Sequence, residues 1–310
     1  MNRDTKRWWV GPASFAAATA LGCTGEQAAG SGDLSIAVSG GAAVRDGFPH
    51  QEGTTTFAFA DGWSLQFSRY VVTVGNLKLT EPESGAVTGE WKQLAAMDVK
   101  KGSGGSVELA TLKGLEAVRH DFAFDFRPVS GSASNLNVDA ESFTLMQDSG
   151  WSLLAEGTAT HPQKGTVSFR LGLPLDASYY ACVNGKDKTQ GISIEANKVT
   201  GAFIYAHAMH MFWDTLSTGD EDLRFDAFAA MKGDDDQVTE EELKGQDLND
   251  LRDGDGQPLK DEQGKAVYYN DDGRLPPGKQ TLYHFVLEAA RGSAHFNGVG
   301  LCKQQSSAGQ

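Results

Sequence analysis

The sequence predicts a mainly β protein, built as an antiparallel β-sandwich with a smaller helical part towards the C-terminus. Apolar side chains alternate with polar ones in many short runs between residues 34 and 175. The clearest runs contain Leu34, Ile36 and Val38; Phe57 and Phe59; Trp63, Leu65 and Phe67; and Phe122, Phe124 and Phe126. Such alternation is typical of antiparallel strands with one buried face. Two sheets that bury these faces against each other are the simplest arrangement for so many short strands.

Two further segments have clear local patterns. Residues 151–173 predict a β-hairpin, in which WSLLAEGTAT turns through HPQKG into TVSFRLGL. Residues 281–291 predict an amphipathic helix that ends at Gly292. We therefore expect a sandwich domain over residues 34–212, with a mixed helical and loop region over residues 213–310 packed on it.

The N-terminus predicts export. Arg3, Lys6 and Arg7 precede an apolar run over residues 8–21 that is too short to span a bilayer as a helix. The run ends in ALGC, which resembles the lipobox of bacterial lipoproteins, where the cysteine is diacylated and becomes the mature N-terminus. We expect residues 1–22 to be a lipoprotein signal peptide and Cys23 to carry the lipid; an ordinary cleaved signal peptide is the alternative.

Residues 23–33 are expected to form a flexible tether, because they are rich in Gly, Ala and Ser and have no apolar period. Thr24, rather than Asp, follows the cysteine. By resemblance to bacterial lipoproteins, this favours the outer membrane, on its periplasmic or surface face. The lipid would then be the membrane anchor.

Export also determines how the remaining cysteines are interpreted. Cys182 and Cys302 do not form a CxxC pair, and in an oxidising compartment they predict one disulfide. A thiolate metal ligand or two free thiols are the alternatives. The formal net charge of -14 makes nucleic acid a poor partner and cations better ones. Excess carboxylates that only keep an exported protein soluble would explain the same balance.

The segment KVTGAFIYAHAMHMF, residues 198–212, is the strongest candidate metal site. His207, Met209, His210 and Met211 lie within five positions, and Asp214 follows. An extended chain would place His207, Met209 and Met211 on one face and His210 on the other, whereas a helix would bring His207, His210 and Asp214 together. Imidazole with thioether suits copper, and two imidazoles with a carboxylate suit zinc or copper. The alternative is a core strand whose histidines are satisfied by hydrogen bonds.

His295 is the third candidate imidazole ligand. It precedes Cys302 by a few residues, so a disulfide between Cys182 and Cys302 is expected to draw it towards His207 and His210.

The segment 231–242 resembles an EF-hand loop, and Asp234, Asp235 and Glu242 are its candidate calcium ligands. Departures from the pattern are Met231 at the first ligand position, Gly233 at the third and Asp236 where the turn glycine belongs. A loop without its first two side-chain ligands should bind calcium poorly. The alternative is that Thr239 and Glu242 cap the following helix.

The stretch LMQDSGWSLLAEGTATHPQKGTVSFRLGL, residues 145–173, is similar to the hallmark region of MbnP-like proteins, which are exported copper-binding partners of di-haem enzymes. The matching positions are Met146, Gly150, Trp151, Glu156, Gly157, Phe169 and Gly172. The resemblance extends loosely to residues 61–67 and 77–79. It implies strands around a copper site and a redox partner. The HAMHM segment and the C-terminus instead resemble lipoproteins of predatory, myxobacterial-type bacteria, for which no activity is implied.

Together these patterns predict a membrane-anchored exported lipoprotein that binds copper or zinc through His207 and His210. Its expected partners are the membrane, through the lipid, and a redox or metal-handling protein. The alternative is a structural or adhesive surface lipoprotein without a metal site. We do not expect an enzyme, because the sequence has no GxSxG, no HExxH and no activated cysteine.

Replacing Cys23 with Ala is expected to abolish lipidation, because the thiol is the acylated group. Cells that express the protein are labelled with a radioactive fatty acid, and the protein is then purified and counted. Wild-type protein without label would contradict the anchor and leave simple secretion.

Overall fold

The computed structural model describes residues 30–217, 219 and 221–306. The predicted signal peptide, Cys23 and most of the predicted tether therefore lie outside the described residues. No helix within these ranges is long and apolar enough to cross a membrane.

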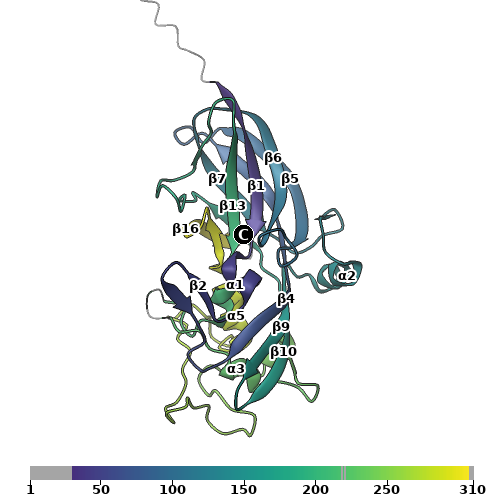
Figure 1. Ribbon diagram of the computed structural model, residues 1–310, viewed down its shortest axis with the longest axis vertical. Coiled ribbons are helices and arrows are strands. Elements are labelled where there is room, and N and C mark those ends of the chain that lie inside the picture. The colour runs from purple at the N-terminus through teal and green to yellow at the C-terminus, as the bar shows by residue number, and fades with distance from the viewer. Residues whose placement is uncertain (1–29, 218, 220, 307–310) are drawn as a thin grey trace, which may run out of the picture.

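The described chain is mainly β, as predicted, and its strands form two large open sheets and one small one (Figure 1). The five-stranded sheet has the order β16 (Gly300–Leu301), β15 (Ala294–Phe296), β13 (Val199–Ala206), β1 (Ser31–Ser39), β6 (Ser106–Glu116). The main path of the ten-stranded sheet has the order β14 (Gln237–Thr239), β10 (Gly165–Leu173), β9 (Leu153–His161), β4 (Ser64–Thr80), β7 (Arg119–Phe126), β11 (Ala177–Tyr180), β17 (Lys303–Ser306). Three further strands pair beside this path: β5 (Val87–Asp98) with β4, β8 (Ser134–Asn135) with β5, and β12 (Ile192–Ser193) with β7. A separate pair joins β2 (His50–Glu52) to β3 (Thr55–Phe57).

Helices are few and short. They are α1 (Gly41–Asp46), α2 (Ala140–Ser149), the 3-10 helix η1 (Ala208–Phe212), α3 (Asp226–Ala229), α4 (Glu240–Leu243) and α5 (Leu282–Arg291). The expected helix over residues 281–291 is α5, which begins after its N-cap Thr281 and ends at Gly292. The expected hairpin is β9 and β10, which pair in antiparallel register from Leu153 with Leu173 to His161 with Gly165.

The prediction of a smaller helical part at the C-terminus is wrong in extent. Beyond residue 213 the only helix longer than four residues in the described chain is α5, and most of the region is loop. Four short strands, β14 to β17, instead add to the edges of the two large sheets. Pairing with these strands gives hydrogen-bond partners to backbone groups that would otherwise be unpaired at the sheet edges. Sequence periodicity does not show which distant segments pair in this way.

Strand β4 connects the two ends of the molecule (Figure 1). Its first half pairs with β9 and its second half with β7, while β5 pairs along the opposite edge. Burial alternates near its ends, but residues 71–75 are all buried. Both faces of the sheet are therefore covered at its centre.

Aromatic side chains join the two large sheets. Phe122 of β7, in the ten-stranded sheet, stacks on Phe296 of β15, in the five-stranded sheet, with ring centroids 4.5 Å apart. Within the ten-stranded sheet, Phe124 of β7 stacks on Tyr179 of β11 at 5.0 Å. Burying such rings removes large apolar areas from water and contributes roughly 2 to 3 kcal/mol each. Of the alternating phenylalanines predicted to be buried, Phe59, Phe67, Phe122, Phe124 and Phe126 are buried, and Phe57 is only partly buried.

A second aromatic group surrounds Phe212, the last residue of η1. Its ring lies 5.4 Å from that of Phe59 and 5.5 Å from that of Phe228, centroid to centroid. Further contacts join it to Phe48, Phe67, Phe169 and Phe225. Because these rings come from strands and loops far apart in sequence, Phe212 fixes η1 against the core.

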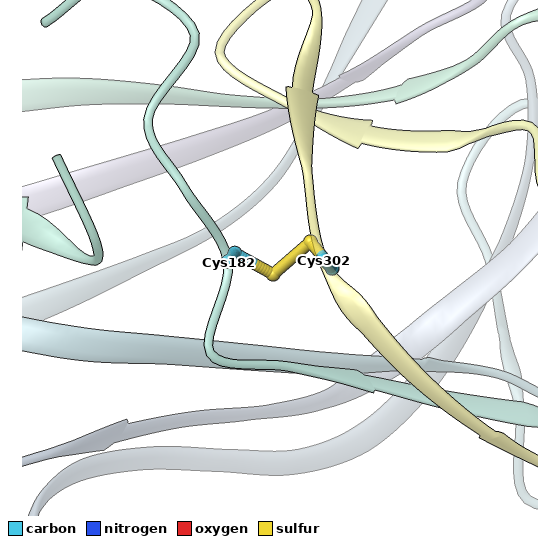
Figure 2. Close-up of a disulfide and its surroundings, with 2 residues drawn as sticks. All are labelled: Cys182 and Cys302. Atoms are coloured by element: carbon cyan, nitrogen blue, oxygen red, sulfur yellow. A yellow bond between two sulfur atoms is a disulfide. The ribbon is translucent and has the colours of Figure 1, made fainter. Parts of the chain in front are cut away.

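Cys182 and Cys302 form a disulfide, as predicted (Figure 2). The bond joins the coil after β11 to the residue between β16 and β17, and the sequence separation is 120 residues. Cys182 is completely buried. The bond therefore ties the C-terminal strand to the middle of the chain.

Replacing Cys182 and Cys302 together with Ala is expected to lower the free energy of unfolding by about 4 kcal/mol, because a long loop in the unfolded chain is no longer closed. Urea unfolding followed by tryptophan fluorescence measures the change. Dithiothreitol should destabilise the wild type to a similar degree and leave the double variant unchanged. A loss below about 1 kcal/mol would contradict the assigned role.

A buried carboxylate attaches the C-terminal region to the start of β4. Asp61 Oδ2 accepts hydrogen bonds from the backbone N–H groups of Phe225 and Asp226, at 2.7 and 2.8 Å. These donors lie at the start of α3, so Asp61 caps that helix from a distant segment. Asp226 in turn accepts from Trp63 Nε1 and from Lys164 Nζ. Burial raises the pKa of Asp61 to about 6, against two opposing backbone hydrogen bonds.

The stability of the fold should therefore fall as pH rises from about 4 to about 6. In this window the unfolded chain releases the Asp61 proton while the folded chain retains it. Once Asp61 is ionised in both states, the free energy of unfolding is about 3 kcal/mol lower than at acidic pH, where it is protonated in both. Asp61→Asn should remove this part of the pH dependence, measured by urea unfolding at several pH values. Asp255→Asn, at an exposed position, is the matched control. An identical pH dependence in Asp61→Asn and wild type would disprove the assignment.

Candidate metal centre

Three imidazoles meet at one end of the five-stranded sheet. His207 directly follows β13, His210 lies in η1, and His295 lies in β15. The ring centroid of His295 is 4.7 Å from that of His207 and 5.3 Å from that of His210. The centroids of His207 and His210 are 6.2 Å apart. His210 is 6% exposed, and the other two are half-buried.

The HAMHM segment turns helical, as in the second of the two expected arrangements, but as a 3-10 helix. The strand β13 ends at Ala206, and the chain then tightens into the 3-10 helix η1. In a 3-10 turn, side chains three residues apart lie above one another. His207, the N-cap, and His210 are three residues apart, and their rings are near parallel, at 24°.

Strand pairing, rather than the disulfide, brings in His295. β15 pairs with β13 in antiparallel register, so that His295 lies opposite Tyr205. Side chains on one face of a strand are two residues apart, so His207 follows Tyr205 on the face that it shares with His295. A backbone hydrogen bond from His207 N to Ser293 O, at 3.0 Å, holds the two segments together. The disulfide closes further along, at Cys302.

Two of the three ring spacings, from His295 to His207 and from His295 to His210, are close to those of imidazoles around one ion, and the third is longer. Tetrahedral nitrogen ligands at about 2 Å from a metal place their ring centroids roughly 5 Å apart. As the side chains stand, no group of three or more His, Cys, Asp or Glu residues in the described ranges is arranged to hold a metal ion.

The cluster favours neutral imidazole. Burial lowers the pKa of His210 well below its ordinary value of 6.5, and the neighbouring His295 and His207 lower it further. Burial and His207 lower the pKa of His295 to about 4, against a smaller opposing effect of the Gly292 backbone. Burial also lowers the pKa of His207, against an opposing hydrogen bond with the Gly298 backbone. Neutral imidazole has the free lone pair that a metal requires.

The ring nitrogens of His207 and His295 differ in their hydrogen bonds. His207 Nε2 lies 3.2 Å from the Gly298 carbonyl oxygen, which leaves its Nδ1 as the second nitrogen. His295 Nδ1 is buried and has no hydrogen-bond partner in the described structure. Metal-binding histidines commonly donate their other ring N–H to a backbone carbonyl, as His207 can here.

The other predicted ligands are placed differently. Met209 is 9% exposed and belongs to the hydrophobic core. Asp214 Oδ2 accepts from Arg224 Nε at 2.7 Å, and its Oδ1 accepts from Asp222 N at 3.0 Å. This carboxylate is therefore already engaged by a cation and a backbone donor.

Two aromatic residues that the sequence did not single out extend the cluster. The ring of Trp213 lies 3.6 Å from that of His210, centroid to centroid, and the ring of Tyr205 stacks on His207 at 5.3 Å. Residues 205 and 207 are two apart, the spacing of one face of a strand, and residues 207, 210 and 213 are three apart, the spacing of one side of a 3-10 helix. Once the strand is known to end at Ala206, this spacing identifies Tyr205 and Trp213 as neighbours of the histidines.

The EF-hand-like segment forms a capped turn. Asp234 and Asp235 are exposed, and Asp235 Oδ1 accepts from Gln237 N at 3.1 Å. Glu242 completes a capping box with Thr239, which lowers the pKa of its carboxyl through a side-chain hydrogen bond. The capping alternative considered for Thr239 and Glu242 is thus observed. Calcium binding by these carboxylates stays a prediction.

Comparison with protein-family models, curated proteins and solved structures gives no match to this chain. The resemblance to MbnP-like proteins therefore stays a prediction. Of its quoted positions, Met146 lies in helix α2 rather than in a strand. Trp151 covers Gly172 so closely that a Cβ at this glycine would lie 2.1 Å from the indole ring.

Proposed function

We propose that this protein is an exported, lipid-anchored lipoprotein that binds one copper or zinc ion through His207, His210 and His295. The observation that carries the proposal is the convergence of three imidazoles from two segments far apart in sequence, with ring centroids 4.7, 5.3 and 6.2 Å apart. Imidazole is a favoured ligand of both metals.

Two properties of the cluster support an ion rather than simple packing. A buried polar atom without a partner costs roughly 1 to 3 kcal/mol, and His295 Nδ1 is such an atom. Burial also favours the neutral, metal-binding form of all three rings. For comparison, both ring nitrogens of the buried His120 have hydrogen-bond partners, whereas Nε2 of the buried His50 has none in the described structure.

The membrane anchor rests on the sequence around Cys23. The lipid would hold the metal-binding domain near a membrane, where a redox or metal-handling protein is its proposed partner. We further propose that the two large sheets form the sandwich expected from the sequence, since Phe122 and Phe296 stack between them.

The purified full chain is expected to bind one equivalent of copper(II) or zinc(II) with micromolar or tighter affinity, measured by equilibrium dialysis with elemental analysis. His207→Ala/His210→Ala should lose this binding, because at most one of the three imidazoles remains. His284→Ala, a half-buried histidine at the other end of α5, is the matched control and should bind as the wild type does.

Circular dichroism verifies that each variant is folded. Tight binding that survives the double substitution would place the ion elsewhere in the chain. A folded wild type that binds neither metal would disprove the proposal and favour a structural or adhesive surface protein.

A further inference from the structure

A large cavity lies away from the histidine cluster, at the end of the molecule opposite to the start of β1 (Figure 1). Its volume is about 860 Å³. This volume is within the range of small-molecule sites, which is roughly 300 to 1,000 Å³. His207, His210 and His295 do not line it, so binding in this cavity does not depend on the proposed metal site.

Three segments that are far apart in sequence enclose the cavity. The turn of the β9–β10 hairpin and the end of α3 form two sides, and the loop over residues 253–260 forms the third. Hydrogen bonds hold this loop in shape, because Asp253 Oδ1 accepts from the backbone N–H groups of Asp255 and Gln257, at 3.0 and 2.8 Å. The walls of the cavity are therefore formed before any ligand binds.

The floor of the cavity is a buried, hydrogen-bonded group. Trp63 is 3% exposed and Asp226 is 5% exposed. Asp226 Oδ1 accepts from Trp63 Nε1 at 2.8 Å and from Lys164 Nζ at 2.6 Å. Because Lys164 balances the charge of Asp226, the floor presents a neutral pair to an occupant.

The charged side chains around the cavity are equal in number for the two signs. They are Lys164, Lys232, Lys260, Asp226, Asp253 and Asp255. Among the residues that the structure describes, Asp255 and Lys260 have neither an ion pair nor a side-chain hydrogen bond, and the amide of Gln257 has no partner either. The loop therefore offers a free acceptor and free donors to a ligand, without a net charge that would select an ion.

The rest of the wall is apolar. Its residues are Trp63, Val167, Ala229, Ala230, Pro258 and Leu259. An occupant of this cavity therefore needs apolar surface as well as polar groups that can donate and accept hydrogen bonds.

We propose that this cavity binds a short neutral oligosaccharide. A carboxylate only accepts hydrogen bonds and an ammonium group only donates them, whereas a hydroxyl does both. Sugar hydroxyls therefore donate to Asp255 and accept from Gln257 and Lys260. The C–H groups of the sugar rings pack on the apolar wall.

Charged ligands match the cavity less well. A carboxylate or phosphate is attracted by Lys260 and repelled by Asp255, and for a cation the signs are reversed. A zwitterion would use both charges, but salt screens such attraction at exposed groups. Hydrogen bonds to neutral hydroxyls depend less on salt, so the salt dependence of binding distinguishes the two kinds of ligand.

The test begins with the purified full chain on an array of neutral, sialylated and sulfated oligosaccharides. The neutral oligosaccharide that binds most strongly is then titrated in a calorimeter. We expect saturable binding of one oligosaccharide per chain, with an affinity that is unchanged between about 0.05 and about 0.5 M NaCl. A metal chelator should leave the binding unchanged, because the histidines do not line this cavity.

Asp255→Ala/Lys260→Ala should weaken the binding by roughly tenfold or more, because two charge-assisted hydrogen bonds to the ligand are lost. This double change keeps the net charge of the protein. Lys113→Ala/Asp148→Ala is the matched control, since it removes the same two charges at exposed positions outside the cavity and should bind as the wild type does.

Circular dichroism verifies that both double variants are folded. Absence of any bound neutral oligosaccharide, or binding confined to the sialylated and sulfated ones, would overturn the proposal. So would binding that weakens steeply as NaCl is added, which would assign the cavity to a charged ligand. Equal affinity in the wild type and the cavity variant would place the sugar elsewhere on the protein and would also overturn it.

Discussion

The antiparallel pairing of β13 with β15 is the constraint on which the histidine cluster depends. It matches Ile204 with Phe296 and Tyr205 with His295. Phe296 is completely buried and stacks on Phe122 of the other sheet. A slip of one residue would exchange the faces of Phe296 and His295. The apolar core therefore fixes the register, and the register in turn brings His295 to His207.

Phe212 has the same effect on the other side of the cluster. His210 precedes it by two residues and His207 by five, and its ring is surrounded by aromatic rings from other parts of the chain. Because the 3-10 helix is anchored at this residue, His210 is held at the margin of the core. That position removes water from its imidazole and so lowers its pKa. Core packing and the electrostatics of the cluster are thus two results of one arrangement.

The sequence was most informative where the relevant pattern is local. The strands β1 and β7, the hairpin of β9 and β10, and the helix α5 with its cap each follow from periodicity within a short window. The pairing of two cysteines followed from their number. The parallel pairing of β1 with β13 could not be predicted, because the partners are far apart in sequence and each is an ordinary apolar strand.

The candidate site was only partly accessible to the same reasoning. The HAMHM composition identified two histidines, but the change from strand to 3-10 helix at Ala206 has no local signature. His295 was included because of the disulfide, whereas strand register is the physical cause of its position. Trp213 was not singled out, since a tryptophan in isolation has no spacing that indicates a site.

The acidic loops and the histidine cluster differ in what their polar atoms already do. Asp253 Oδ1 accepts hydrogen bonds from the backbone of Asp255 and Gln257, and Asp261 Oδ1 accepts in the same way from Gln263 and Lys265. These carboxylates stabilise tight turns, and exposed charge attracts cations only weakly because salt screens it. His295 Nδ1, in contrast, is desolvated and has no partner in the described structure. A coordinate bond to a metal would satisfy that nitrogen, so the neutral histidines, rather than the excess of carboxylates, are where a specific cation site is to be sought.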